Sequence, residues 1–407
     1  MSKPILISIS PNTDKTDVLL SLKLLFQPWQ WQKGDQLQQL KQQLKQYFNA
    51  SHCWLLNAGR SALYLALKSL NLKPTDQVLC QAFTCVAVPN AIGWAGAEPV
   101  FIDTLKNGFN LDVEDLKRKI TQKSKALIIQ HTFGQPDDLK AIKKICRKHQ
   151  LILIEDCAHS LGAGYQGKPI GTFGDITVLS FGRDKVISSV FGGALLTHNQ
   201  ALAKKINPLA KDLKPPSLFW TFKQLLHPLI MAIVIPLYFT FSLGKALLFL
   251  YQKSGLLTLP VSSKEKQAQI SLQPRLLPNA LTTLALHQLK KLEKINQKRK
   301  QIAQQYQKVL ELPPGPEGSI YIRFPILVDQ PEKLISLAKK QKILLGDWYR
   351  PIIAPKGVSL KRVGYRPGTC PHAQAVSQKV VNLPTHPKMT TKDAHRVIKI
   401  VKDYVNH

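Results

Sequence analysis

Short apolar runs alternate with amphipathic segments from about residue 50 to residue 200 of this chain. The runs are apolar at successive positions, which is typical of strands that are buried on both faces. Such strands, separated by helical segments, predict an α/β fold with a mostly parallel sheet between two layers of helices. The expected strands are 77–82, 99–103, 126–130, 151–156, 176–181 and 194–197, and the expected helices between them include 61–70, 113–120 and 138–149.

Other periodic segments flank this region. Residues 36–48 place apolar side chains on one helical face and predict an entry helix, whereas 276–311 predict one long basic helix. The basic face of that helix has two interpretations, a solvated surface or a contact with phosphate or membrane. After Pro313, a strand at 320–328 and helices at 331–340 and 391–405 predict a smaller α+β domain. The expected division is 1–206 for a large domain with an N-terminal entry segment, 207–268 for an apolar helical insertion, 269–311 for the linking helix and 312–407 for the small domain.

The charge balance is strongly positive. The 56 Lys and Arg residues outnumber the 25 Asp and Glu residues, which gives a net charge of +31 over 407 residues. Such a field attracts phosphorylated metabolites, nucleic acid and anionic lipid alike. No zinc finger, RNA-binding strand signature or aromatic-interleaved basic strand accompanies the charge, so we do not expect a nucleic-acid partner.

The six cysteines form no CxxC pair and have no histidine at zinc-finger spacing, so we expect no structural metal site. Most of them lie in apolar runs, which indicates buried thiols in a reducing compartment. The apolar patch at residues 4–9 is too short for a signal peptide. These features predict a cytoplasmic protein.

One segment departs from the α/β pattern, because no formal charge occurs between Lys223 and Lys245 and a second apolar run ends at Tyr251. About 20 apolar residues can span a bilayer. A single crossing would separate candidate catalytic residues on its two sides, and residues 218–251 are too few for two crossings. The sequence therefore predicts a hairpin, bent at Pro236, that either lies in an anionic membrane surface, on the inner face of the plasma membrane, or is buried at a protein contact.

Two candidate catalytic residues follow expected strands. Asp156 ends an apolar strand, and carboxyl ends of parallel strands are where α/β sheets bind ligands. Its carboxylate can pair with a cationic ring nitrogen, although an aspartate at this place can also be a loop or helix cap. Lys185 follows the next strand in a turn rich in Ser and Gly. Such a lysine is either exposed to solvent or desolvated, and a desolvated amine has a lowered pKa and becomes a Schiff-base nucleophile.

A third signal lies upstream, where Asn57-Ala-Gly59-Arg60-Ser61 opens a helix after a short apolar run. Glycine with amide and hydroxyl donors at a helix start is typical of a phosphate-binding site.

Together, in this order, these segments resemble the DegT/StrS-like family of sugar aminotransferases, which use pyridoxal 5'-phosphate (PLP). The resemblance covers nearly the whole chain outside 207–268. Its further matching stretches are 97–103, 131–134, 167–175, 365–373 and 383–387. It implies a fold-type I PLP-dependent transferase, with a mostly parallel seven-stranded sheet in the large domain.

The resemblance also implies a role for each matching residue. Lys185 would hold PLP covalently and then act as general acid and base. Asp156 would keep the pyridine nitrogen protonated, and His159 would lie near the phenolic oxygen. Gln273 matches an Asn that in relatives reaches the phosphate from the neighbouring subunit, which implies a homodimer. The implied phosphate ligands of the same subunit are Gly59, Arg60, Ser61 and Ser180.

Three positions differ from the usual pattern of the family. Cys85 stands where relatives stack an aromatic residue on the cofactor ring, Phe191 replaces an acidic residue, and Arg60 replaces a Thr. The expected reaction is the transfer of an amino group from an amino acid, with glutamate as the expected donor, to a nucleotide- or lipid-linked keto-sugar for surface glycans. The alternative is a PLP-binding regulatory or scaffold protein with little turnover.

Overall fold

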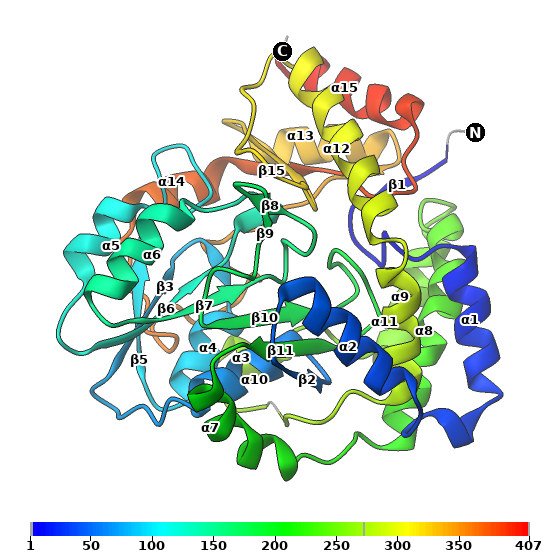
Figure 1. Ribbon diagram of the computed structural model, residues 1–407. Coiled ribbons are helices and arrows are strands. Elements are labelled where there is room, and N and C mark those ends of the chain that lie inside the picture. The colour runs from blue at the N-terminus through cyan, green and yellow to red at the C-terminus, as the bar shows by residue number, and fades with distance from the viewer. Residues whose placement is uncertain (1–2, 272, 406–407) are drawn as a thin grey trace.

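The structure, a computed structural model, describes residues 3–271 and 273–405. Its large domain is built on a seven-stranded sheet in which every strand except β11 runs parallel to the others (Figure 1). This arrangement confirms the predicted α/β fold. In spatial order the strands are β2 (His52–Leu56), β11 (Gly193–Thr197), β10 (Ile176–Ser180), β7 (Ile152–Asp156), β6 (Ser124–Ile129), β3 (Gln77–Gln81) and β5 (Glu98–Ile102).

Helices cover both faces of this sheet. The connections through α3 (Gly59–Lys68) and α4 (Ala87–Trp94) run along the sheet toward β5, whereas those through α5 (Val113–Lys119) and α6 (Leu139–Lys148) run back from it. Right-handed crossovers place connections of opposite direction on opposite faces. Accordingly, α3 packs on α4 and α5 packs on α6. Both faces of the strands are thus buried, which explains why their sequences are apolar throughout.

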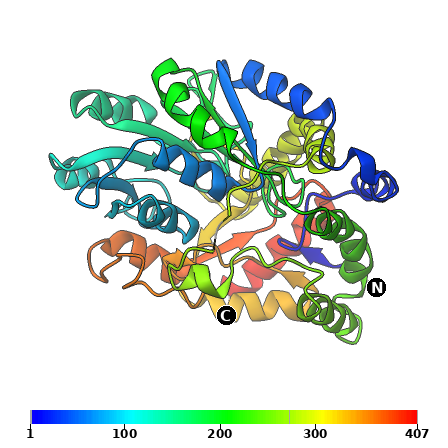
Figure 2. The same ribbon diagram turned by 90° about the horizontal axis from the view of Figure 1, so that it is seen from below.

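The small domain contains the antiparallel pair β12 (Phe324–Leu327) and β15 (Val380–Leu383). The first strand of the chain, β1 (Ile5–Leu6), also lies there, because it pairs with β13 (Ile343–Leu344). In Figure 2 the orange and red C-terminal elements lie together on one side of the blue-to-green large domain. The helices of this domain are α12 (Leu292–Val309), α13 (Pro331–Lys340), α14 (Pro371–Lys379) and α15 (Thr391–Val405).

The prediction of one long helix over 276–311 is wrong. The structure has two helices, α11 (Asn279–Leu289) and α12, with a break at Lys290 and Lys291. The amide of Lys291 donates to Gln288 O, three residues back, which tightens the last turn of α11. The break lets α11 pack on α1 (Lys15–Leu25) and α2 (Gln36–Phe48) of the large domain while α12 packs on α15 of the small domain. Helical periodicity alone does not reveal a change of direction of this kind.

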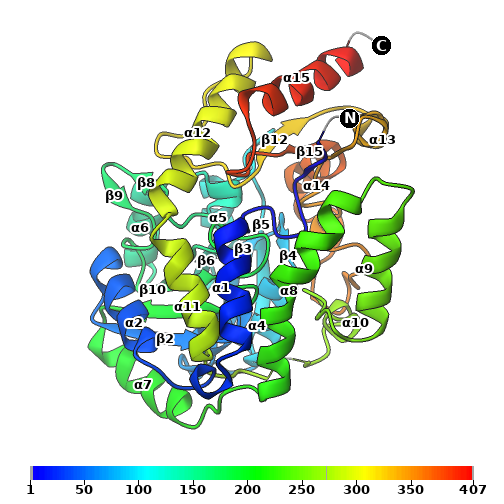
Figure 3. The ribbon, with the colours of Figure 1, turned by 90° about the vertical axis from the view of Figure 1, so that its right-hand side faces the viewer.

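The apolar insertion forms two antiparallel helices, α8 (Leu218–Leu237) and α9 (Leu243–Lys253), which lie side by side (Figure 3). One face of α8 packs on α1 (Lys15–Leu25) and α11. Among the described residues, α8 is the one helix with the length and composition to cross a membrane, but a helix in a protein core can have the same properties. Since 44% of its apolar window is buried, α8 belongs in part to the protein interior.

Candidate active site

A cavity of about 580 Å³ opens at the carboxyl edge of the large sheet. Asp156 ends β7 and Ser180 ends β10, so both side chains reach the cavity because parallel strands end at the same edge. Lys185 enters it from the turn between β10 and β11. The predicted site residues that line the cavity are Gly59, Arg60, Cys85, Asp156, His159, Ser180 and Lys185.

Lys185 and Asp156 influence each other electrostatically within this cavity. Burial lowers the pKa of the Lys185 amine, an effect that the nearby Cys85 and Asp156 oppose. Burial likewise raises the pKa of Asp156, and the charge of Lys185 opposes that change. The sequence left open whether Lys185 is exposed or desolvated, and the structure half-buries it in the cavity wall, where partial loss of solvent lowers the pKa of its amine. An amine with a lowered pKa is a better nucleophile and base near neutral pH.

The start of α3 forms one end of the cavity, close to Ser180. A Cβ atom at Gly59 would lie 2.7 Å from the Ser180 Cβ, so only glycine permits this approach. The Arg60 guanidinium forms an ion pair with Glu265 and donates to Pro260 O. Ser61 does not line the cavity. Its hydroxyl donates instead to Asn57 Oδ1 at 2.7 Å.

Aromatic side chains from the small domain form a wall that the sequence did not reveal. The imidazole of His159 stacks on Trp348, with 5.3 Å between ring centroids, and its Nε2 is 3.1 Å from the Tyr349 hydroxyl. The Arg323 guanidinium lies over Trp348, and the Lys185 amine is 5.2 Å from the centre of the Trp348 ring. Burial lowers the pKa of His159 well below its usual value, and the nearby charges of Lys185 and Arg323 lower it further, which favours the neutral imidazole. In the sequence, the adjacent aromatic residues Trp348 and Tyr349 were the one feature that could have indicated this wall. Only the packing of the two domains brings them to Lys185.

The insertion also contributes to the cavity wall. Phe191 contacts Trp220 of α8, with 5.8 Å between ring centroids, and the Arg183 guanidinium lies over the Phe191 ring at 5.1 Å. Phe191 thus replaces the acidic residue of the family pattern with a ring that contacts both the indole and the guanidinium. The segment that follows α9 continues along the cavity with Pro260, Val261 and Lys266.

Gln273 lies outside the cavity in this single chain. Its Oε1 accepts a hydrogen bond of 3.0 Å from Arg275 Nη2, and its main-chain oxygen accepts one from Asn57. Its role across a subunit boundary therefore stays a prediction.

Comparison with known proteins identifies a related family. Residues 13–213 and 265–402 match the DegT/DnrJ/EryC1/StrS aminotransferase family, and the unmatched interval contains both helices of the insertion. The spore coat polysaccharide biosynthesis protein SpsC of Bacillus subtilis is 28% identical over 390 residues, 92% of this chain and 90% of its own. The GDP-perosamine synthase of Vibrio cholerae is 34% identical over 177 residues, 44% of this chain and 48% of its own.

A solved structure also resembles this fold. The putative sugar aminotransferase Spr1654 of Streptococcus pneumoniae, in its PMP-form, superposes with a TM-score of 0.76. The match covers 98% of each chain at 20% sequence identity. The two chains therefore share one fold over nearly their whole lengths.

Proposed function

Because this chain belongs to the DegT/DnrJ/EryC1/StrS aminotransferase family, we propose that it is a PLP-dependent enzyme that transfers an amino group from an amino acid, with glutamate as donor, to a keto-sugar used in surface glycans. The observation that carries this proposal is that the half-buried lysine Lys185 and the buried carboxylate Asp156 line one cavity, where the charge of each affects the pKa of the other. The names of the relatives, which describe polysaccharide biosynthesis and an amino-sugar synthase, support the substrate class.

The residues of the cavity fit PLP. The Nδ1 atom of His159 is buried without a hydrogen-bond partner among the described residues, which suits a site that a polar ligand completes. The missing side chain at Gly59 lets the start of α3 lie against Ser180, so that a helix N-terminus, an element that typically binds phosphate, borders the cavity. PLP, when bound, supplies an electron sink for chemistry at the substrate carbon.

The chain's own groups supply the remaining functions. The Lys185 amine takes up and returns a proton as general base and acid, which its lowered pKa favours. The Asp156 carboxylate would hold a proton on the pyridine nitrogen of the cofactor, and the stacked His159 and Trp348 rings would help to orient the cofactor. The phosphate ligands we assign on this chain are the Gly59 amide, Arg60 and the Ser180 hydroxyl.

We assign the acceptor to the sugars that are linked to a carrier through a diphosphate. Besides Arg60, Asp156 and Lys185, the cavity is lined by four cations, Arg183, Lys266, Arg350 and Lys356, and by two acids, Asp184 and Asp347. Cationic side chains suit phosphate oxygens, whether the carrier is a nucleotide or a lipid. The apolar insertion beside the cavity favours the lipid carrier.

The same insertion supports attachment to an anionic membrane surface through residues 218–251. Its far end exposes apolar side chains, and Phe241 at the turn is fully exposed. The Lys245 amine lies 5.4 Å from the ring centre of Tyr238, and the Lys223 amine lies 5.2 Å from that of Phe219. Amines beside aromatic rings are typical of the boundary between lipid headgroups and hydrocarbon. The other exposed apolar residues of the helices are Leu218, Phe219, Ile233, Leu243, Phe249 and Leu250.

A screen of donors and acceptors tests the enzymatic proposal. Purified protein with PLP is expected to show the violet absorption of a lysine Schiff base, and this band should decay when the donor amino acid is added. Lys185→Ala should lose both properties, whereas Lys290→Ala should keep them, because Lys290 is exposed at the end of α11 and does not line the cavity. A stable band that no amine changes would refute an aminotransferase and favour the regulatory or scaffold protein, which the cysteine at position 85 keeps open.

Sedimentation with vesicles tests the membrane proposal. The full chain should sediment with vesicles that contain anionic lipid, and a variant with Phe241→Ser and Phe249→Ser should lose most of this binding. Phe26→Ser is the matched control, because Phe26 is also an exposed aromatic residue but lies at the end of α1. Equal binding by the hairpin variant and the wild type would rule out attachment through α8 and α9.

A further inference from the structure

The main chain of Lys185 is held from behind by a segment near the N-terminus. Residues 9–12, which we call the N-terminal clasp, connect the small domain to α1. The Ser10 amide donates to Asp184 Oδ1 at 3.3 Å. The side-chain amide of Asn12 donates to the main-chain oxygens of Lys185 and Val186. The carbonyl groups of Lys185 and Val186 therefore both point toward the clasp.

A buried arginine completes this arrangement. Arg299 of α12 is 1% exposed, and its Nη2 donates to Val186 O at 3.0 Å and to Asn12 Oδ1 at 2.9 Å. Its Nη1 donates to Asn296 Oδ1 at 2.8 Å. Within residues 3–271 and 273–405, no carboxylate lies within ion-pair distance of this guanidinium.

A buried charge without a counter-ion is costly, and an apolar residue of similar volume is often at least as stabilising. The energetic reason for an arginine at this position is therefore weak if its only task is to fill the core. Its hydrogen bonds instead connect three segments that are far apart in sequence: the clasp, the Lys185 turn and α12. The Lys185 amide donates to Gly182 O at 3.1 Å, so the peptide groups on both sides of the lysine are fixed.

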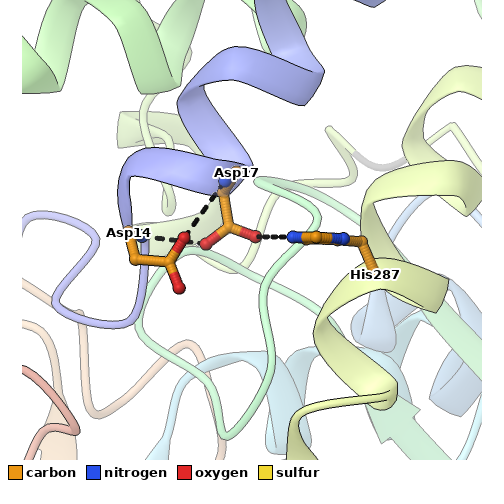
Figure 4. Close-up of side chains that lie close together, drawn as sticks. All are labelled: Asp14, Asp17 and His287. Atoms are coloured by element: carbon orange, nitrogen blue, oxygen red, sulfur yellow. Dashed lines mark hydrogen bonds and ion pairs between the residues drawn. The ribbon is translucent and has the colours of Figure 1, made fainter.

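The clasp is itself anchored at its α1 end, as the close-up in Figure 4 shows for Asp14, Asp17 and His287. Asp14 and Asp17 form a capping box at the start of α1, and His287 Nε2 lies 3.5 Å from Asp17 Oδ1. The Lys291 amine lies 2.9 Å from Asp14 Oδ2 and 3.1 Å from Asp17 Oδ1, so its ammonium group is the counter-ion of both carboxylates. This cluster fixes the clasp to the α11–α12 junction.

We propose that Asn12 and Arg299 are positioning residues for the aminotransferase reaction: they fix the main chain of Lys185 and Val186 so that the lysine amine stays directed into the cavity. The proposal rests on the proposed function, since it assumes that Lys185 is the reacting amine. Neither residue touches the cavity, so each acts through the backbone of Lys185. A misplacement of about 1 Å of a reacting group can cost about 100-fold in rate.

The test compares holoenzymes of the wild type, Asn12→Ala, Arg299→Lys and Arg299→Met. Lys300→Met is the matched control, because Lys300 is an exposed cation on the same helix, next to Arg299. Three quantities are measured: the fraction of chains that bind PLP, the single-turnover decay of the violet band with a saturating amino donor, and the pH at which that band titrates. The midpoint of urea unfolding is recorded for each variant.

We expect Asn12→Ala and Arg299→Lys to bind PLP in every folded chain, yet to react about 10- to 100-fold more slowly, with a displaced titration midpoint of the band. Lys300→Met should match the wild type. A purely structural role would lower the unfolding midpoint and leave the rate per folded chain and the titration unchanged, and that result would overturn the proposal. If Arg299→Met fails to fold, the rate per folded chain and the titration of Asn12→Ala and Arg299→Lys test the proposal. If all three variants fail to fold, their role is structural and the proposal is overturned. A wild type without the violet band would instead refute the proposed function.

Discussion

The substitution Gly59→Ala tests how closely the start of α3 must approach the sheet. The added Cβ would lie 2.7 Å from Ser180 Cβ, 3.0 Å from Ser180 Oγ and 3.2 Å from Leu179 O. Carbon atoms in contact are normally about 3.5–4.0 Å apart, so α3 and β10 would have to separate by about 1 Å. The start of α3 has little freedom to move, because its backbone also lies close to Gly193 of β11.

Two effects of this separation can be given a magnitude. Overpacking of this kind costs about 1–3 kcal/mol in the free energy of unfolding. A hydrogen bond to a charged group contributes about 1.5–3 kcal/mol, so the loss of one between the α3 amides and the cofactor phosphate should weaken PLP binding about 10- to 100-fold. The assays are urea unfolding of the protein without PLP and a titration with PLP followed by absorbance.

Gly93→Ala is the matched control for this prediction. Gly93 lies inside α4, and an added Cβ there meets nothing within 4 Å. Alanine in a helix is favoured over glycine by about 0.5–1 kcal/mol, so this variant should be more stable and bind PLP normally. If Gly59→Ala binds PLP as tightly as the wild type does, the start of α3 is not the phosphate site and the assignment of Gly59 fails.

Three further predictions concern residues in and around the cavity. Burial opposes the charged form of His131, but Asp137 and Glu155 outweigh it and raise its pKa to about 9. The contribution of protonated His131 to the free energy of unfolding is therefore complete below about pH 6.5, and up to about 3 kcal/mol of it is lost as the pH rises through 9. Urea unfolding from pH 6 to 10 should show this loss, and His131→Gln should abolish this dependence of stability on pH. Glu265→Gln leaves Arg60 in the cavity wall without its counter-ion and should lower the free energy of unfolding by about 1–3 kcal/mol. The control is Glu114→Gln, which removes an exposed ion pair with Lys117 and should change the free energy of unfolding by less than about 0.5 kcal/mol. Trp348→Ala removes the ring that stacks on the active-site imidazole and should increase PLP dissociation, measured by dilution and recovery of absorbance, about 10-fold; an unchanged rate would argue against an aromatic wall around the cofactor.

The sequence alone determined the parts of this protein that depend on local burial. Strands with both faces covered must be apolar at every position, so β3, β5, β6, β7, β10 and β11 could be recognised from their composition and spacing. Asp156 and Lys185 could be recognised as candidates because one ends such a strand and the other lies in the turn after the next strand, at the same edge of the sheet, and the resemblance to the family supplied their roles. The order of the motifs was enough to indicate the family, which the comparison then confirmed.

Tertiary structure decided the features that join segments far apart in the chain. Trp348 and Tyr349 reach the cavity only because the small domain packs against its opening, and Asn12 and Arg299 meet behind Lys185 although 287 positions separate them. The break between α11 and α12 has the same origin, since each helix packs on a different domain. Periodicity records whether a residue is buried, but it does not record against which residue, and the chemistry of this site depends on those partners.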